Sequence, residues 1–319
     1  MDTSVLPIFL ASEIYVALFD TVTEQLKKLD STSKVSQLKK KIPKKPEELN
    51  HPQIVIREMI RFESLGFIRE HQILPECELK EKPLSIMHLH ELLKRYHDID
   101  SRVLDFGFSE ELFWRRVLAK INDVNLAKVF QKLGEKYHLP QLCTIDEIRR
   151  WFYQWQMSIG TVCDLDLSRC GLSYLPKELQ YFSNLEKLNL SNNKLFSLPE
   201  WFSSLQTLTQ LDLSANTFTT IPESVCQLTE LLMLDMSVNA ILDIPESISQ
   251  LESLKVLSFS SNKISSLPSS FTQLENLKYL SLMNNQIKEF PLVICKLDTL
   301  RKLYLSSNYI TALPEELKN

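Results

Sequence analysis

Histidine and cysteine are the side chains of this sequence best suited to metal binding or nucleophilic chemistry. His90 and Glu91 open a stretch spaced like the zinc motif H-E-x-x-H, which needs a second histidine four residues after the first. Lys94 occupies that second position, so the motif is broken. His88 and His90 lie two residues apart and would point to nearly opposite sides of a helix. The histidines therefore predict no metal site.

The remaining catalytic patterns also fail. Cys143 follows His138, but their spacing is not diagnostic of a nucleophile and its base. The chain has five glycines, and no two are close enough to form a loop that cradles phosphate. We therefore predict no catalytic, cofactor-binding or metal-binding residues, and no cofactor. The protein is not expected to be an enzyme.

A unit of 23 residues repeats through the second half of the chain. Its asparagines keep a constant spacing, with a cysteine in the first place: Cys170, Asn193, Asn216, Asn239, Asn262, Asn285 and Asn308. Prolines from Pro176 to Pro314 keep the same period, and leucines complete the pattern L-x-x-L-x-L-x-x-N-x-L-x-x-L-P. Each unit predicts a short strand, a bend and a return segment. One unit cannot bury its own leucines, so the units must stack.

This pattern resembles the leucine-rich repeat of intracellular proteins. The resemblance covers residues 161–319 and implies a solenoid of seven turns with a parallel sheet on its concave side. The predicted fold class is α+β: a helical N-terminal domain (1–143), a capping helix (144–160) and a leucine-rich repeat domain (161–319). Apolar return-segment residues should close the core from behind: Phe202, Val225, Ile248, Phe271 and Ile294.

The front half predicts helices, in the order Ser4 to about Leu29, Pro52 to Gly66, from Pro83, from Ser109, and a fifth that stops at Gly134. The apolar start lacks a basic signal-peptide region and is too short to span a membrane, which favours a buried helix over a membrane-associated one. A basic stretch follows it, with Lys39, Lys40, Lys41, Lys44 and Lys45. A solvated loop is the favoured interpretation, and weak contact with anionic lipid or nuclear import is the alternative.

The last helix before the repeats should cover the first turn. Thr144 and Glu147 form a capping box at its start. Its apolar face carries Trp151, Phe152 and Trp155, which we expect to pack over the first strand because the end of a solenoid needs cover. An exposed groove for a partner is the alternative. At the far end, we expect the leucines of the seventh turn to need cover from self-association, a partner or further residues.

The outward strand positions predict a binding face. Acidic residues occupy the early and middle turns, whereas aromatic and methionine side chains gather on the late ones. Isolated apolar residues are ordinary on a protein surface, but their gathering on one face is typical of an interface. The predicted partner-binding residues are Asp212, Met233, Asp235, Val256, Tyr279, Met283, Lys302, Tyr304 and Tyr309.

The charge and the cysteines limit the classes of partner and the cellular compartment that we expect. The net charge of −4 gives no argument for nucleic acid as a partner. Residues 161–319 carry 12 Lys and Arg against 17 Asp and Glu, so the repeat half is mildly acidic. The six cysteines show no paired spacing, which favours free thiols in a reducing, cytoplasmic compartment.

The junction Ile145-x-x-Ile148-Arg149-Arg150-Trp151-Phe152, running into Val162-Cys163-Asp164-Leu165-Asp166-Leu167-Ser168, resembles the entry to the repeats of effector proteins from intracellular bacteria. It implies a non-catalytic protein that binds and occludes a host or same-organism protein, and that reaches a host cytosol without a classical signal peptide. A scaffold for small GTPases is one alternative, because the repeats equally resemble Ras-pathway scaffolds. A ubiquitin-ligase component is the other, although Leu6-Pro7-Ile8 departs from the F-box signature and Cys163-Asp164 departs from the catalytic C-x-D of ligase effectors.

Overall fold

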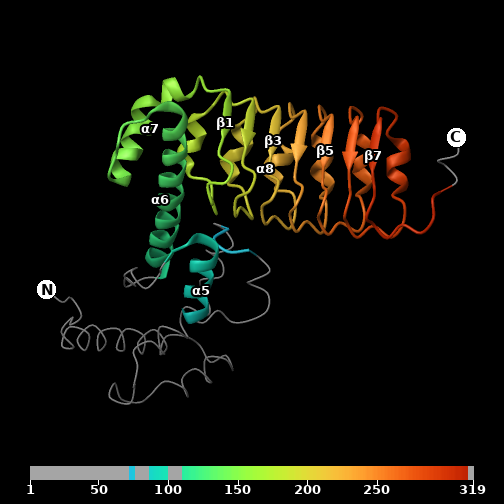
Figure 1. Cartoon of the computed structure of the whole chain (residues 1–319), viewed down its shortest axis with the longest axis horizontal. Helices are drawn as coiled ribbons and strands as arrows, with labels where there is room; N and C mark the ends of the chain where they lie inside the picture. Colours follow the sequence, from blue (N-terminus) through green and yellow to red (C-terminus); the bar gives the residue numbers. More distant parts are fainter. Residues whose placement is uncertain (1–71, 76–85, 100–109, 315–319) are drawn as a thin grey trace, which may run out of the picture.

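The computed structural model describes residues 72–75, 86–99 and 110–314. Three sequence predictions lie outside these residues. They are the two helices from Ser4 and Pro52, the basic stretch between 39 and 45, and the helix start at Pro83. Helices α5 (Ile86–His97), α6 (Glu110–Tyr137) and α7 (Ile145–Ile159) precede the repeats. Figure 1 shows α6 and α7 at one end of a long solenoid, with α5 beside its first turns.

Each turn of the solenoid contributes one strand of three residues to a parallel sheet. The seven strands follow chain order, from β1 to β7, as the repeat predicts. They are β1 (Asp164–Asp166), β2 (Lys187–Asn189), β3 (Gln210–Asp212), β4 (Met233–Asp235), β5 (Val256–Ser258), β6 (Tyr279–Ser281) and β7 (Lys302–Tyr304). Neighbouring strands keep one register, so each outward side chain lies beside its equivalent in the next turn.

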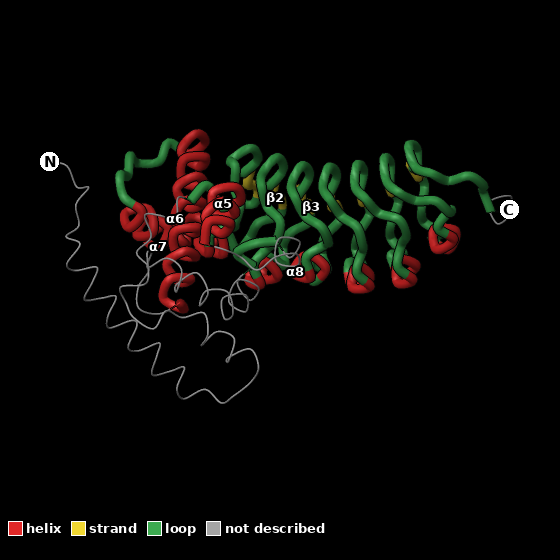
Figure 2. The backbone as a smooth tube through the Cα atoms, turned by 90° about the horizontal axis from the view of Figure 1, so that it is seen from below, coloured by secondary structure: helices red, strands yellow, loops and turns green. Residues whose placement is uncertain are grey.

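The return segments form single helical turns on the opposite side of the solenoid (Figure 2). They are η3 (Lys177–Tyr181), η4 (Glu200–Ser204), α8 (Glu223–Cys226), η5 (Glu246–Gln250), η6 (Ser269–Gln273) and η7 (Leu292–Lys296). A proline precedes each, with φ between −63° and −73°, a value already suited to entering a helical turn. The five predicted apolar residues of these segments are all buried, which confirms that they close the core from behind.

The repeated asparagine ties adjacent turns together. Asn216 donates through Nδ2 to the carbonyls of Leu190 (3.0 Å) and Leu213 (3.1 Å), and its Oδ1 accepts the amide of Leu195 (3.0 Å). The other asparagines repeat this pattern, which satisfies backbone groups that would otherwise be buried without partners. In the first turn, Cys170 holds this position and contacts the carbonyl of Ser168 through its sulfur (3.5 Å).

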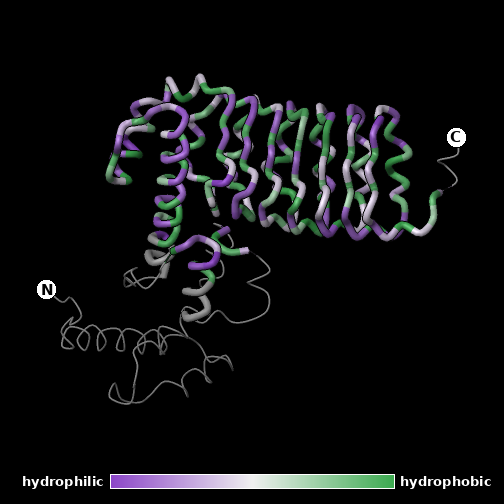
Figure 3. The backbone as a smooth tube through the Cα atoms, viewed as in Figure 1, coloured by the Kyte–Doolittle hydropathy of each residue, from purple (hydrophilic) through white to green (hydrophobic). Residues whose placement is uncertain are grey.

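One continuous hydrophobic core runs from α6 and α7 through to the seventh turn. Figure 3 shows hydrophobic and hydrophilic stretches alternating within each turn, as expected when inward leucines alternate with outward side chains. The capping helix is therefore part of the same core as the repeats.

Helix α6 differs from the sequence prediction, which placed two helices between Ser109 and Gly134. The structure has one continuous helix that passes through Gly134 and ends at Tyr137. Its later apolar face, which includes Phe130 and Leu133, packs into the shared core. That packing outweighs the cost of roughly 1 kcal/mol that glycine imposes inside a helix.

Helix α7 confirms the predicted capping box, because Thr144 and Glu147 bond each other's backbone amides. Phe152 is fully buried and packs edge-on against Phe182 of the first turn (6.5 Å between centroids). Trp151 is partly buried, but Trp155 is 51% exposed, so the expectation that all three aromatics cover the turn is wrong for Trp155. Its ring instead stacks on Trp151 at the rim of the contact, with centroids 6.4 Å apart.

A buried polar network joins α5 to the first turn. The ring of His97 donates through Nε2 to the carbonyl of Ile73 (2.5 Å), which leaves Nδ1 to accept the hydroxyl of Ser173 (2.9 Å). Asn125 of α6 accepts the amide of Ser173 (3.0 Å). Burial lowers the pKa of His97 to about 4, so the ring is neutral at physiological pH. Phe196 of the second turn packs edge-on against this histidine (6.0 Å).

Candidate functional site

The outward face of the sheet carries an apolar patch that we define as Met233, Val256, Tyr279 and Tyr304. The first three are aligned on β4, β5 and β6, so their side chains form one row. Tyr304 lies on β7 and packs diagonally against Tyr279, with ring centroids 5.3 Å apart. Met233 and Tyr304 are 41% and 40% exposed, which leaves the patch open to solvent.

The two acidic residues of the predicted set have a structural contact as well as a charge. Asp212 and Asp235 each accept, through Oδ1, the backbone amide two residues later, at 2.8 Å from Ser214 and Ser237 respectively. Asn189 makes the same bond in the second turn without a charge. An uncharged side chain can therefore make the same bond, and the negative charge of Asp212 and Asp235 is a property additional to it.

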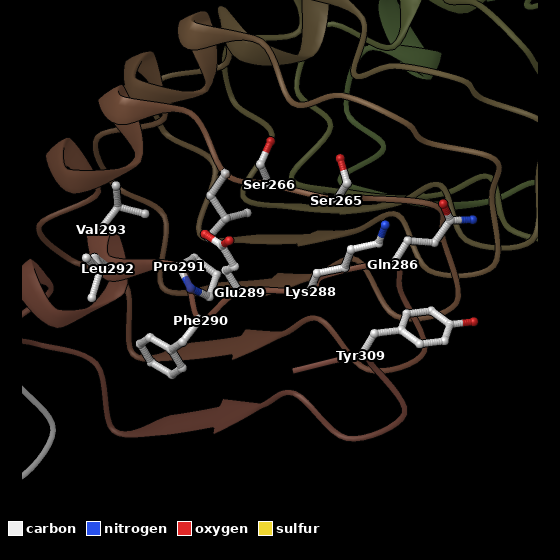
Figure 4. A pocket seen from close by; sticks show the side chains of 11 residues that line it. Ser265, Ser266, Gln286, Lys288, Glu289, Phe290, Pro291, Leu292, Val293 and Tyr309 are labelled. Atoms are coloured by element: carbon white, nitrogen blue, oxygen red, sulfur yellow. The ribbon is translucent and has the colours of Figure 1, made fainter. Parts of the chain in front are cut away.

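The remaining predicted residues divide between two places. Lys302 is exposed on β7, and Met283 is exposed two residues after β6, so both lie on the sheet side. Tyr309, at 66% exposure, instead lines an open hollow of about 810 Å³ beyond the bend. Gln286 and Lys288 line the same hollow (Figure 4). Tyr309 therefore belongs to a separate surface from the apolar patch.

The structure also reveals cations that the sequence reasoning missed. Lys255, Lys278 and Arg301 each stand one residue before a strand, in consecutive turns, and all three are exposed. The amide of Lys278 donates to the carbonyl of Lys255, and that of Arg301 to the carbonyl of Lys278, both at 2.9 Å. We call these three residues the basic row. Their 23-residue spacing is visible in the sequence, but they precede the strands, and the predicted binding face was built from outward strand positions.

Among the described residues, no group of side chains could hold a metal ion. None of the described helices is long and apolar enough to cross a membrane. The described cysteines, which exclude Cys77, are all unpaired.

Comparison with known families agrees with this geometry. A family described as "Leucine-rich repeat region" matches residues 158–259, and one described as "Leucine Rich repeats (2 copies)" matches residues 252–293 and 275–319. The chain is a leucine-rich repeat protein. Its repeats imply a protein-interaction module, and domains of this kind are typically non-catalytic.

No curated protein matches this leucine-rich repeat chain. Among solved structures, an LRR protein of Leptospira interrogans is 32% identical, with a TM-score of 0.46. The similarity covers 52% of this chain and 48% of that one, so this chain aligns with about half the length of the Leptospira protein.

Proposed function

We propose that this leucine-rich repeat protein binds another protein through the sheet face of turns four to seven, and that it does so without catalysis. The observation that carries the proposal is the exposed apolar patch. Tyrosine and methionine side chains are costly to leave in water and are enriched in the cores of interfaces. On this sheet they stand on neighbouring strands that the asparagine bonds hold in fixed register.

Its biological role, in this proposal, is that of an effector or regulator that occludes a functional surface of its partner. The sequence at the junction between α7 and the first turn supports this, because it resembles the entry to the repeats of bacterial effectors. Unpaired thiols support a cytosolic setting, either that of the producing cell or that of a host.

The test begins with a pull-down from host lysate and from the producing cell, followed by titration of the recovered partner against Tyr279→Ala/Tyr304→Ala. We expect a loss of roughly 2 kcal/mol or more in binding free energy, as for truncation of interface anchors. Tyr153→Ala is the matched control, because Tyr153 is 65% exposed on α7, away from the sheet. Unchanged affinity in the double variant would place the interface elsewhere.

A further inference from the structure

Charge is sorted along the sheet face. The face positions of turns five to seven comprise the residue before each strand, the outward strand residues and the bend that follows. They carry four cations, namely the basic row and Lys302, and no Asp or Glu. The same positions of turns three and four carry Asp212 and Asp235 and no cation. More broadly, residues 195–254 contain eight Asp and Glu and no Lys or Arg.

The basic row serves no evident purpose within the fold. Its three side chains are exposed, and none makes an ion pair with a described residue. The acidic residues nearest in sequence are Glu252, Glu275 and Asp298, three residues earlier in each turn, and none of these is ion-paired within the described part either. Like charges on adjacent strands repel, so the row is unfavourable until an anion lies along it.

The basic row begins in turn five, one turn before the first tyrosine of the face, Tyr279. The equivalent position holds Cys163, Glu186, Thr209 and Leu232 in turns one to four, so no cation stands there before turn five. Lys278 directly precedes Tyr279, and Arg301 precedes β7, which carries Tyr304. Turns six and seven therefore carry both cations and tyrosines on the same face, and turn five adds Lys255.

We propose that turns five to seven bind an acidic segment of the partner protein. Carboxylates of that segment pair with the basic row and Lys302, while its apolar side chains pack on Tyr279 and Tyr304. This inference rests on the proposed function and adds the chemistry of the bound segment. The tyrosine pair supplies contact area that a purely ionic site would not need.

The acidic middle turns favour a protein over other polyanions. Nucleic acid or an anionic membrane would extend past turn five and meet Asp212, Asp235 and the cation-free stretch, which repel phosphate. A protein segment can change its charge along its length. A partner acidic at one end and basic at the other would meet complementary charge on both halves of the face, and this fixes the direction in which it binds.

A labelled random copolymer of glutamate and tyrosine tests the proposal by fluorescence anisotropy at low salt. We expect the copolymer to bind the unmodified protein and to lose at least about tenfold in affinity in Lys278→Glu/Arg301→Glu. Lys263→Glu/Lys288→Glu is the matched control, because it changes the net charge equally at exposed lysines beyond the bend. We expect this control to lose less than about twofold. Melting curves and the milder Lys278→Gln/Arg301→Gln variant separate lost binding from lost folding.

Three outcomes would overturn the inference. They are the absence of copolymer binding, an equal loss in the control variant, and equal or tighter binding of duplex DNA or anionic vesicles through the same two residues. Once the natural partner is isolated, its binding to the two double variants distinguishes this inference from the proposed function. If the partner is lost in Tyr279→Ala/Tyr304→Ala but retained in Lys278→Glu/Arg301→Glu, the binding face stands and the acidic segment does not.

Discussion

Asp212 and Asp235 each combine a hydrogen bond to the backbone with a charge that this bond does not need. An asparagine in the same place accepts the same amide, as Asn189 shows in the second turn. Substitution by asparagine therefore removes the charge while keeping the backbone bond. This makes the two properties experimentally separable.

We expect Asp212→Asn/Asp235→Asn to slow association with the partner and to leave the melting temperature almost unchanged. The loss should shrink as salt rises, because exposed charges act mainly by steering encounter and are screened by ions. Stopped-flow association at several salt concentrations measures this. A loss that persists at high salt, or that appears in the dissociation rate, would contradict electrostatic steering.

His97 should make the stability of the protein depend on pH. Its pKa is about 4 in the folded state, compared with an ordinary value of 6.5, so the unfolded chain takes up the proton first as pH falls. Stability is therefore intact above pH 6.5 and is lost as pH falls from about 6.5 to about 4, by up to roughly 3 kcal/mol. Urea denaturation followed by circular dichroism across this range measures the effect.

His97→Asn provides the comparison, since asparagine does not titrate there, although it costs stability at every pH. The difference in unfolding free energy between the variant and the parent should narrow as pH falls. His138→Asn, at an exposed position, should track the parent throughout. A parent curve that is flat between pH 7 and pH 4 would count against a buried neutral histidine.

At the scale of elements, α7 should stabilise the repeats through one residue above all. Phe152 is fully buried against the first turn, so Phe152→Ala should cost roughly 3–5 kcal/mol of unfolding free energy. Trp155→Ala removes a larger but half-exposed ring and should cost clearly less. Thermal or urea denaturation of the two variants decides between them. Equal losses would mean that the aromatic face acts as one unit, as the sequence alone suggested.

A second structural link holds α7 in place. Arg149 pairs with Asp123 of α6 and lies 3.5 Å from the nearly buried carboxylate of Glu178 in η3. The cap is thus fixed to both the preceding helix and the first return segment. Only the three-dimensional structure could show this, because the three residues lie far apart in the chain.

The sequence predicted the elements that repeat and misjudged one that does not. Every strand and asparagine followed from a constant 23-residue spacing, because each turn meets nearly the same neighbours. Helix α6 has no such redundancy. Because glycine commonly ends helices, the sequence predicted an end at Gly134. In the structure, Phe130 and Leu133 pack into the shared core, and the helix continues to Tyr137.

At the scale of the whole molecule, the protection of backbone amides from hydrogen exchange should decline toward the seventh turn. Leu282 donates its amide to the carbonyl of Tyr304 in the next turn (2.8 Å), but Leu305, its equivalent, has no such acceptor among the described residues. Leu303 and Leu305 are also only half-buried, whereas Leu280 and Leu282 are fully buried.

We therefore expect the amides of β7 and of Leu305 to exchange with deuterium much faster than those of β4, as in a locally less stable end of a repeat array. Hydrogen exchange with mass spectrometry on a protein of measured mass in solution tests this. Equal protection of Leu282 and Leu305 in a monomer would show that the last turn is covered after all.

Part of the binding face could also be predicted from the constant spacing of the repeat. The register alone placed Met233, Val256 and Tyr279 in one row, and the structure confirms that row. The basic row was not predicted, because its residues precede the strands. Tyr309 was assigned to the face from its place in the repeat, but the bend after Asn308 turns it toward the hollow.

The uniform register of β4 and β5 also bears on how this molecule can evolve. Leu234 and Leu257 occupy equivalent places, so duplication of one unit between them would add a turn that satisfies the same backbone and core contacts. Such an event would move Asp235 away from the tyrosines by one strand spacing of about 4.8 Å while leaving both groups unaltered. The length of the recognised segment and the identity of its side chains are therefore separately adjustable. A lineage could retune the reach of this protein through recombination and its selectivity through point mutation.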